Sequence, residues 1–218
     1  FHRLSKTTAS NTFDKIRNYF EALPREKNID FQCINDLSRT IEIYYALVNA
    51  ERFEEAYGLY KNRLEDSLDK ASAFATIVML LKALFPDGLD KLPRLEGYQT
   101  QSYLITAISN AMHMIDMCDE ALVLKKMSVN MDLEQKSLRN LTVSLINYGI
   151  HLEYEDKISS ALEAYHLALA IDQVRESESK QAYDYFRLVS LLTDIGDIKR
   201  AEEAADMYYR FEHAGDAD

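Results

Sequence analysis

Glycine and proline are scarce in this 218-residue chain, which has six glycines, three prolines and no tryptophan. Strand-rich folds need many tight turns, and tight turns are built mostly from glycine and proline. Leu, Ala, Glu, Lys and Met, which all form helices well, dominate most of the sequence. We therefore expect an all-α protein, long enough to bury a sizeable core as one compact domain or one repeat array.

Positive charge is also in short supply, because 25 Lys and Arg residues stand against 36 Asp and Glu residues and the formal net charge is −11. A nucleic-acid partner requires a basic stripe facing its phosphates, and an anionic membrane surface requires a basic patch. The longest mostly apolar run, residues 71–81, ends at Lys82 and is too short to span a bilayer. The sequence thus predicts no nucleic-acid partner and no membrane partner.

Cysteine is rare as well, and the two cysteines, Cys33 and Cys118, form neither a CxxC pair nor a disulfide framework. On that ground we expect a reducing, cytoplasmic setting. The chain begins with Phe1 rather than Met and carries no signal peptide, so we expect it to be a piece of a larger protein.

Motifs for catalysis and cofactor binding are missing. No Gly is followed by Lys, no GxGxxG occurs, and the five histidines form neither an HExxH motif nor a Cys/His cluster with zinc spacing. His113 and Cys118 are five residues apart, which is a poor spacing for one helix face. We predict that the protein is not an enzyme and that it has no catalytic residue, no cofactor and no metal site.

An internal repeat organises most of the chain. The segments DKISSALEAYHLALAI and DIKRAEEAADMYYRF align with Ala161 on Ala201, and the same 40-residue offset separates Ala121 from Ala161. A further copy aligns through Ala56, but a longer, 65-residue separation lies between it and Ala121. A recurring unit of this size is typical of a helical repeat array.

Each copy follows a second apolar stripe at a constant offset. The stripe before Ala161 consists of Leu145, Tyr148, Gly149 and Leu152. The stripe before Ala201 consists of Tyr185, Leu188, Val189 and Leu192. Because this spacing marks one face of a helix, the unit is a pair of antiparallel helices, and we expect the chain to turn at residues 153–156 and 196–197.

The stripe LINYGIHL, followed by Ile158, Ala161, Tyr165 and Ala168, resembles the signature of the tetratricopeptide repeat (TPR). This resemblance implies antiparallel helix pairs stacked into a right-handed solenoid, with Gly149 facing Ala161 where the helices approach closely. It covers residues 34–214, although Lys125 stands where the family prefers an aromatic residue. The 40-residue period exceeds the family's usual length of about 34 residues, so we expect longer helices. An irregular helical bundle with ordinary alanine packing is the alternative.

The sequence predicts two parts and one insertion. Residues 1–32 would hold an N-terminal helix, the end of a preceding module, and residues 33–218 would form the repeat array. An insertion at about residues 69–97 explains the 65-residue separation; it contains an apolar helix over residues 71–85, ended by Pro86, and then a loop. The loop at 86–97 is either a partner-binding projection or a linker anchored by Leu89, Leu92 and Leu95, and the regular leucine spacing favours the linker.

The first helix of each pair carries aromatic, apolar and amide side chains on the face opposite its packed stripe. We predict that this face binds a polypeptide, because rings supply contact area and amides hydrogen-bond a partner's backbone. For Val143, Ile150 and Tyr183 the alternative is a place in the core between repeats. The predicted partner-binding residues are Tyr45, Asn49, Tyr103, Asn110, Met114, Asn147, Ile150, Tyr154 and Arg187.

Residues 44–66 and 84–96 also resemble the repeat regions of large bacterial signalling proteins, in which TPR arrays follow a STAND-type nucleotide-switch ATPase. This resemblance implies a protein-interaction scaffold or sensor segment that binds a polypeptide in a concave groove. The alternative is a stand-alone TPR regulator that binds a short signalling peptide or a small ligand. Neither interpretation identifies the partner or the oligomeric state, because a fold does not determine a function.

Overall fold

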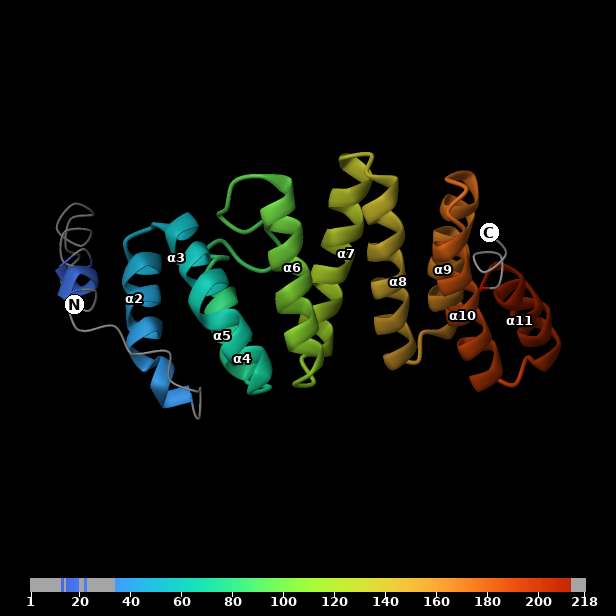
Figure 1. Cartoon of the computed structure of the whole chain (residues 1–218), viewed down its shortest axis with the longest axis horizontal. Coiled ribbons are helices and arrows are strands. Elements are labelled where there is room, and N and C mark those ends of the chain that lie inside the picture. Colours follow the sequence, from blue (N-terminus) through green and yellow to red (C-terminus); the bar gives the residue numbers. More distant parts are fainter. Residues whose placement is uncertain (1–12, 14, 20–21, 23–33, 213–218) are drawn as a thin grey trace. The chain divides into compact units, whose positions relative to one another are not determined.

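The computed structural model describes residues 13, 15–19, 22 and 34–212 (Figure 1). Every regular element in that part of the chain is helical, which confirms the all-α prediction. Residues 15–19 are helical, while most of the predicted N-terminal helix and Cys33 lie outside the described residues. None of the described helices is both long enough and apolar enough to cross a bilayer. The chain divides into two compact units, residues 1–117 and 118–218.

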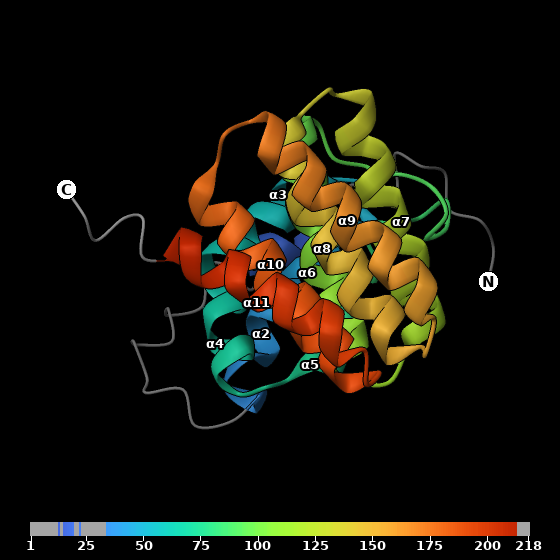
Figure 2. The same cartoon turned by 90° about the vertical axis from the view of Figure 1, so that its right-hand side faces the viewer.

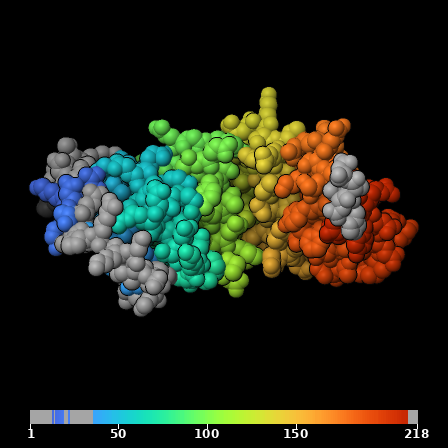
Figure 3. Space-filling model, viewed as in Figure 1, coloured from blue at the N-terminus to red at the C-terminus, as the bar shows by residue number. Residues whose placement is uncertain are grey.

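Over residues 118–212 the second unit consists of five successive helices that run alternately up and down (Figure 1). They are α7 (Cys118–Glu134), α8 (Leu138–Tyr154), α9 (Ile158–Val174), α10 (Glu178–Asp194) and α11 (Ile198–Glu212). The most extensive contacts join α8 to α9 and α10 to α11, which are the predicted antiparallel pairs. Figure 2 shows this unit with α10 and α11 nearest the viewer, and Figure 3 gives the space-filling view of its surface from the direction of Figure 1.

The turns of the second unit recur at a constant interval. Lys136, Asp156, Glu176 and Gly196 follow successive helices, and their φ angles lie between 53° and 78°. After each of them the next amide donates to the carbonyl five residues back, as Lys157 N–H does to Leu152 O at 2.8 Å. This is the Schellman motif that commonly ends helices. The 40-residue sequence period therefore contains two helices of 17 residues, each followed by a three-residue turn, as the long period predicted.

The core of the second unit contains the predicted stripes. Its buried members from α8 to α11 include Leu145, Leu152, Ala161, Leu188, Leu192 and Ala201. Gly149 is buried against the ring of Tyr165, and a Cβ at position 149 would come within 3.0 Å of three ring atoms. The predicted close approach of α8 and α9 is present, and the nearest atoms to a Cβ at position 149 belong to the ring of Tyr165, one helical turn after Ala161. Helical side chains point toward the helix N-terminus, so the Tyr165 ring covers the level of Ala161 one turn earlier.

The first unit is less regular than the second. A short 3-10 turn, η1 (Ile34–Leu37), leads into α2 (Ser38–Asn49). The next helix is continuous but contains a wider π-helical turn: α3 (Phe53–Leu59) passes through η2 (Tyr60–Leu64) into α4 (Glu65–Lys70). The inserted helix α5 (Phe74–Lys82) and the long helix α6 (Tyr98–His113) follow. The insertion predicted at residues 69–97 thus contains a helix, which is shorter than the predicted 71–85.

The loop between α5 and α6 is anchored to the first unit. Leu84, Phe85 and Leu95 are buried, whereas Leu92 is 46% exposed and Leu89 is half-buried. The Arg94 amide donates to Leu84 O at 3.0 Å, which closes the loop. Leu95 therefore anchors the linker as predicted, but Leu92 does not, because regular spacing has no fixed meaning outside a helix or a strand.

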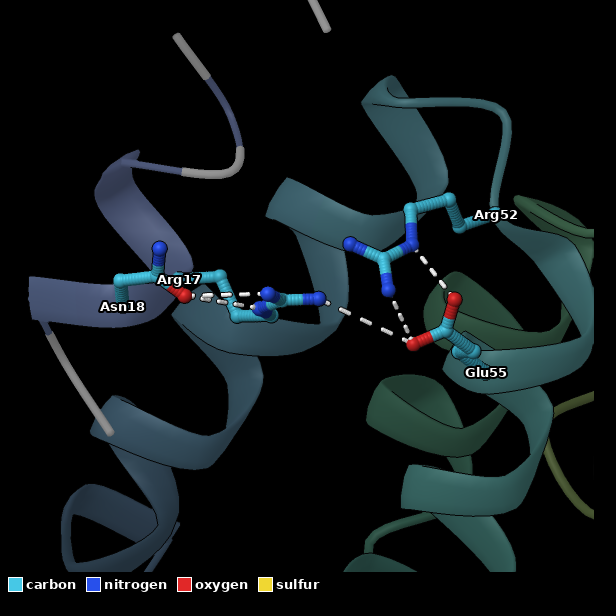
Figure 4. A network of polar contacts seen from close by, with 4 residues as sticks. All are labelled: Arg17, Asn18, Arg52 and Glu55. Carbon is cyan, nitrogen blue, oxygen red and sulfur yellow. Dashed lines mark hydrogen bonds and ion pairs between the residues drawn. The ribbon is translucent and has the colours of Figure 1, made fainter. Parts of the chain in front are cut away.

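Arg17, from the helical residues 15–19, reaches the beginning of α3 (Figure 4). Its Nη1 lies 3.8 Å from Glu55 Oε2, and both oxygens of the same carboxylate accept hydrogen bonds from the Arg52 guanidinium. Glu55 is exposed, and exposed ion pairs contribute about 0–1 kcal/mol. These charges therefore link residues 15–19 to the beginning of α3 but contribute little to stability.

Candidate functional site

A cavity of about 150 Å³ in the second unit collects residues from the predicted partner-binding face. It lies between α8 and α10, beside the C-terminal end of α9. Its lining residues are Thr142, Val143, Ile146, Asn147, Asp172, Lys180, Tyr183 and Asp184. Val143 and Tyr183 are 48% and 47% exposed, so they are not core residues, and their apolar surfaces face solvent beside the cavity. Because these two residues are one 40-residue period apart, the repeat places them at equivalent helix positions.

Two buried carboxyl groups form the polar side of this cavity. Asp172 is 0% exposed and Asp184 is 2% exposed, and the Oδ2 atom of each has no hydrogen-bond partner among the described residues. Oδ1 of Asp172 accepts a hydrogen bond from Arg175, the residue after α9. Burial, reinforced by the negative charge of Asp172 and by a hydrogen bond between the two carboxyl groups, raises the pKa of Asp184 to about 7, while Lys180 acts in the opposite direction. The carboxyl pair is therefore poorly neutralised by the protein itself.

Sequence reasoning missed this pair, although the repeat contains a signal for it. Asp132 lies one repeat period before Asp172, and Ser144 lies one repeat period before Asp184. In the earlier repeat the Ser144 hydroxyl donates to Asp132 Oδ2, and both residues are buried. The repeats align through their apolar positions, and such an alignment does not compare buried polar residues. It therefore does not show that the partner of the recurring aspartate changes from Ser144 to Asp184.

Arg187 links three helices of the second unit. Its Nη2 donates to Glu153 Oε2 at 2.6 Å and to the Tyr165 hydroxyl at 3.0 Å. The guanidinium also lies 5.5 Å from the centre of the Tyr165 ring. Both hydrogen bonds come from Nη2, which faces the interior of the unit, and the role of Arg187 in partner binding stays a prediction.

The other predicted residues of α8 have different surroundings. Asn147 is half-buried and lines the cavity. Ile150 is partly buried against the core, as its alternative interpretation stated, and Tyr154 is 70% exposed near the end of α8. The structure therefore brings Asn147 to the cavity, while Ile150 and Tyr154 are not among the residues that line it.

A cavity of about 250 Å³ in the first unit contains three further predicted residues: Tyr103, Asn110 and Met114. The Tyr103 hydroxyl donates to Glu65, while Lys61 pairs with Glu65 and lies 3.8 Å from the centre of the Tyr103 ring. Partial burial and the hydrogen bond to Glu65 raise the pKa of Tyr103. Tyr45, half-buried, and Asn49, exposed, lie on α2 and do not line this cavity.

A third group of side chains contains residue types that bind metals. Cys118, His151 and Glu155 each offer one ligand atom, and these atoms lie within 4.8 Å of one another. The His151 Nε2 atom is 2.8 Å from Cys118 O. Spacing along one helix could not reveal the group, because Cys118 and His151 lie on different helices and meet only where α7 packs on α8. The ligand types suit zinc, but structural zinc sites have four protein ligands, and Glu155 also lies 3.6 Å from Lys157.

No family model matches the sequence, and no curated protein sequence matches it significantly. Solved structures do resemble the chain in fold. A putative kinesin light chain from Podosopora anserina with nearly identical TPR-like repeats is 11% identical, with a TM-score of 0.55 over 98% of this chain and 90% of that one. The fold is TPR-like. BtubC (BKLC) from P. vanneervenii is 12% identical, with a TM-score of 0.52 over 97% of this chain and 75% of that one.

Aspartyl phosphate phosphatase F from Bacillus subtilis also has a similar fold. It is 14% identical, with a TM-score of 0.53, and the match covers 97% of this chain but only 55% of the phosphatase. At such low identities the likeness concerns the fold alone. It confirms the helical-repeat solenoid that the stripes around Gly149 and Ala161 predicted.

Proposed function

We propose that this TPR-like array is a protein-interaction scaffold that binds an extended polypeptide along the face formed by α8 and α10. The observation that carries the proposal is the cavity between these helices, where Asn147 meets the exposed apolar surfaces of Val143 and Tyr183. Helical repeats offer extended surfaces, and a ring beside an amide can supply both contact area and hydrogen bonds to a peptide backbone.

The size of the cavity supports a peptide over a small ligand. Pockets for small molecules usually measure about 300–1,000 Å³, whereas the cavities of the first and second units measure about 250 and 150 Å³. A space of this size suits one inserted side chain of a longer partner. The stand-alone regulator that closes on a small ligand is therefore the less supported candidate.

The biological setting is part of the same proposal. We propose a non-catalytic sensor segment of a larger bacterial signalling protein that acts in the cytoplasm, on the resemblance of residues 44–66 and 84–96 to STAND-associated repeats. In that setting the first unit would contribute Tyr103, Asn110 and Met114 of its own cavity to partner recognition.

A selection from a random decapeptide library tests the binding function. We expect enriched peptides whose affinity falls at least about tenfold after Asn147→Ala combined with Tyr183→Ala, since truncation at the centre of an interface typically costs about 1.4 kcal/mol, or about tenfold in Kd. Asn130→Ala on α7 combined with Tyr209→Ala on α11 is the matched control, because both residues are exposed and neither lines the cavity. Peptides that bind equally to the cavity variant and the control, or a selection that enriches none, would contradict the proposal.

A further inference from the structure

We infer that the cavity between α8 and α10 accepts a positively charged lysine or arginine side chain of the bound polypeptide, which pairs with Asp172 and Asp184. This inference rests on the proposed function and specifies the chemistry of its partner.

The two successive repeats of the second unit provide the first argument. At the α7–α8 position the Ser144 hydroxyl donates to the buried Asp132 carboxylate and also lies 2.9 Å from the Ser128 hydroxyl. At the equivalent α9–α10 position in the next repeat both residues are aspartates, which can share a hydrogen bond only while one of them holds a proton; once both are ionised, neither can donate to the other. The pair of positions therefore carries its own hydroxyl donor in one repeat, and in the next repeat it lacks a donor when both carboxyl groups are ionised.

The second argument is the location of the acceptor oxygens. Asp172 and Asp184 are both more than nine-tenths buried, each keeps an Oδ2 atom without a partner among the described residues, and both line the cavity. Buried carboxylates are normally paired or hydrogen-bonded, because burial removes their hydration. A ligand that offers several N–H donors and a positive charge would supply what this site lacks.

Arg175 and Lys180, the cations that the described residues place beside the pair, do not meet this need. Arg175 is engaged with Oδ1 of Asp172, and the side chain of Lys180 is exposed although it lines the cavity. Lys180 lowers the pKa of Asp184, but the net result of burial and charge is still a raised pKa. Arg175 and Lys180 therefore leave the negative charge of the carboxyl pair only partly compensated, and a further positive charge would be favourable there.

The apolar lining distinguishes a basic side chain from a simple ion. Val143, Ile146 and Tyr183 surround the approach to the carboxyl pair, and lysine and arginine bury their aliphatic stems against such surfaces while their charged ends are paired. Mg²⁺ and Ca²⁺ prefer six or more oxygen ligands and retain water, which fits an apolar lining poorly. The net charge of −11 would also favour approach of a basic segment.

Side-chain analogues test the site without knowledge of the partner. We would titrate the full chain at pH 7.5 with n-butylammonium, n-butylguanidinium, n-butanol and Mg²⁺, and record amide NMR shifts. We expect the two cations to perturb the α8 and α10 amides that border the cavity, and n-butanol to have no comparable effect. Equal perturbation by n-butanol, or saturation by Mg²⁺ alone, would overturn the inference.

Three variants locate the effect. Asp184→Asn keeps the shape of the side chain, and Asp184→Ser copies the satisfied pair found one repeat earlier, so a folded protein is expected in at least one case. Both should weaken n-butylammonium binding at least tenfold, whereas Asp194→Asn, an exposed charge change on the same helix, should leave it unchanged. Unchanged binding in a folded Asp184 variant would overturn the assignment.

The peptides from the library selection separate this inference from the proposed function. We expect enrichment of Lys or Arg, and at least a tenfold loss of affinity when that residue is replaced by norleucine. Peptides that bind at the cavity without a basic residue would overturn the inference and leave the scaffold function in place. A selection that yields no peptide would contradict the scaffold function itself, whereas the analogue titration would still report on the cation site.

Discussion

The two units use the same helix-ending turn but place different elements between their turns. In the first unit the left-handed residues Glu51, Ser72 and Asp116 are unevenly spaced, because a π-helical turn and an inserted helix with its loop intervene. In the second unit the corresponding residues recur at a constant interval. The turn is thus the common element of the fold, while the helices vary in length and shape.

A similar contrast separates the polar networks of the two units. Each unit has a tyrosine, a glutamate and a cation in mutual contact: Tyr103 with Glu65 and Lys61, and Tyr165 with Glu153 and Arg187. Tyr103 is 43% exposed beside a cavity, but Tyr165 is fully buried against Gly149. The same group of residues therefore lines a surface in the irregular unit and fills the core in the regular one.

The largest predicted effect comes from filling the space over Gly149. We expect Gly149→Leu to destabilise the fold by about 3 kcal/mol, since overpacking a core typically costs about 1–3 kcal/mol, occasionally more, and here the Tyr165 ring would have to move. Thermal melting and urea denaturation would measure the change. A melting midpoint within about one degree of the parent would contradict the packing described for this pair.

Gly58 in the first unit is the matched control. It lies in helix α3, and a Cβ there would have no neighbour within 4 Å. Alanine loses less conformational freedom than glycine in a helix, so Gly58→Ala should stabilise the protein by about 0.5–1 kcal/mol. Opposite signs at the two glycines would show that only the regular unit requires a close helix approach.

The second prediction concerns Asp184. At this position the regular unit departs from its own repeat, which has Ser144 one period earlier. The pKa of this residue is raised from 3.8 to about 7 in the folded protein, so the folded state loses stability as pH rises toward and through 7. The groups that face it are Asp172 on α9, Lys180 on α10 and, beyond them, Arg175. We expect Asp184→Asn to be more stable than the parent by about 2 kcal/mol at pH 8 and by much less at pH 4.

Urea denaturation at both pH values would measure this difference, with Asp194→Asn as the exposed control. A gain at pH 8 that persists unchanged at pH 4 would show that the ionised carboxyl pair is not its cause.

The third prediction concerns Lys125, which lies one 40-residue period before Tyr165. Lys125 is buried, and burial lowers its pKa from 10.5 to about 8. A lowered lysine pKa means that stability falls as pH decreases through 8, so most of the cost of the buried charge is present at pH 7. We expect Lys125→Met to stabilise the protein by about 1–2 kcal/mol at pH 7.

Chemical denaturation between pH 7 and pH 10 would follow the effect, and the advantage of Lys125→Met should shrink as the pH rises. The exposed Lys126→Met on the same helix serves as a control and should show no such dependence.

The sequence predicted the fold better than the binding surface, for physical reasons that particular residues illustrate. Apolar stripes such as Leu145 to Leu152 repeat with the period of a helix, and their side chains are buried because removing apolar surface from water is favourable. The sequence predicts that Arg187 lies on a first helix of a pair, but it does not predict the contacts with Glu153 and Tyr165. Those contacts depend on the side-chain conformations of residues on three different helices. The carboxyl pair of Asp172 and Asp184 was missed because it depends on packing between α9 and α10.

The smallest effects are expected at the turns, which the two units share. Glu176 adopts φ of 54°, a left-handed conformation that costs an ordinary residue about 1 kcal/mol or more. Glycine has no such cost but loses more freedom on folding, by about 0.5–1 kcal/mol. We therefore expect Glu176→Gly in the second unit and Glu51→Gly in the first to stabilise the protein by about 0.5 kcal/mol each.

Asp156→Gly should stabilise the protein less than Glu176→Gly does, because aspartate tolerates the left-handed region better than glutamate. Gly196→Ala, at the glycine that already occupies the equivalent turn, should instead destabilise the protein by about 1 kcal/mol. Urea denaturation of the four variants would measure these changes against Glu163→Gly, an exposed position inside α9 that should lose stability. Equal changes in the free energy of unfolding for Glu51→Gly and Glu176→Gly would show that the turn is energetically the same in both units. Stabilisation by Glu176→Gly alone would instead show that the effect depends on the regular turn spacing of the second unit.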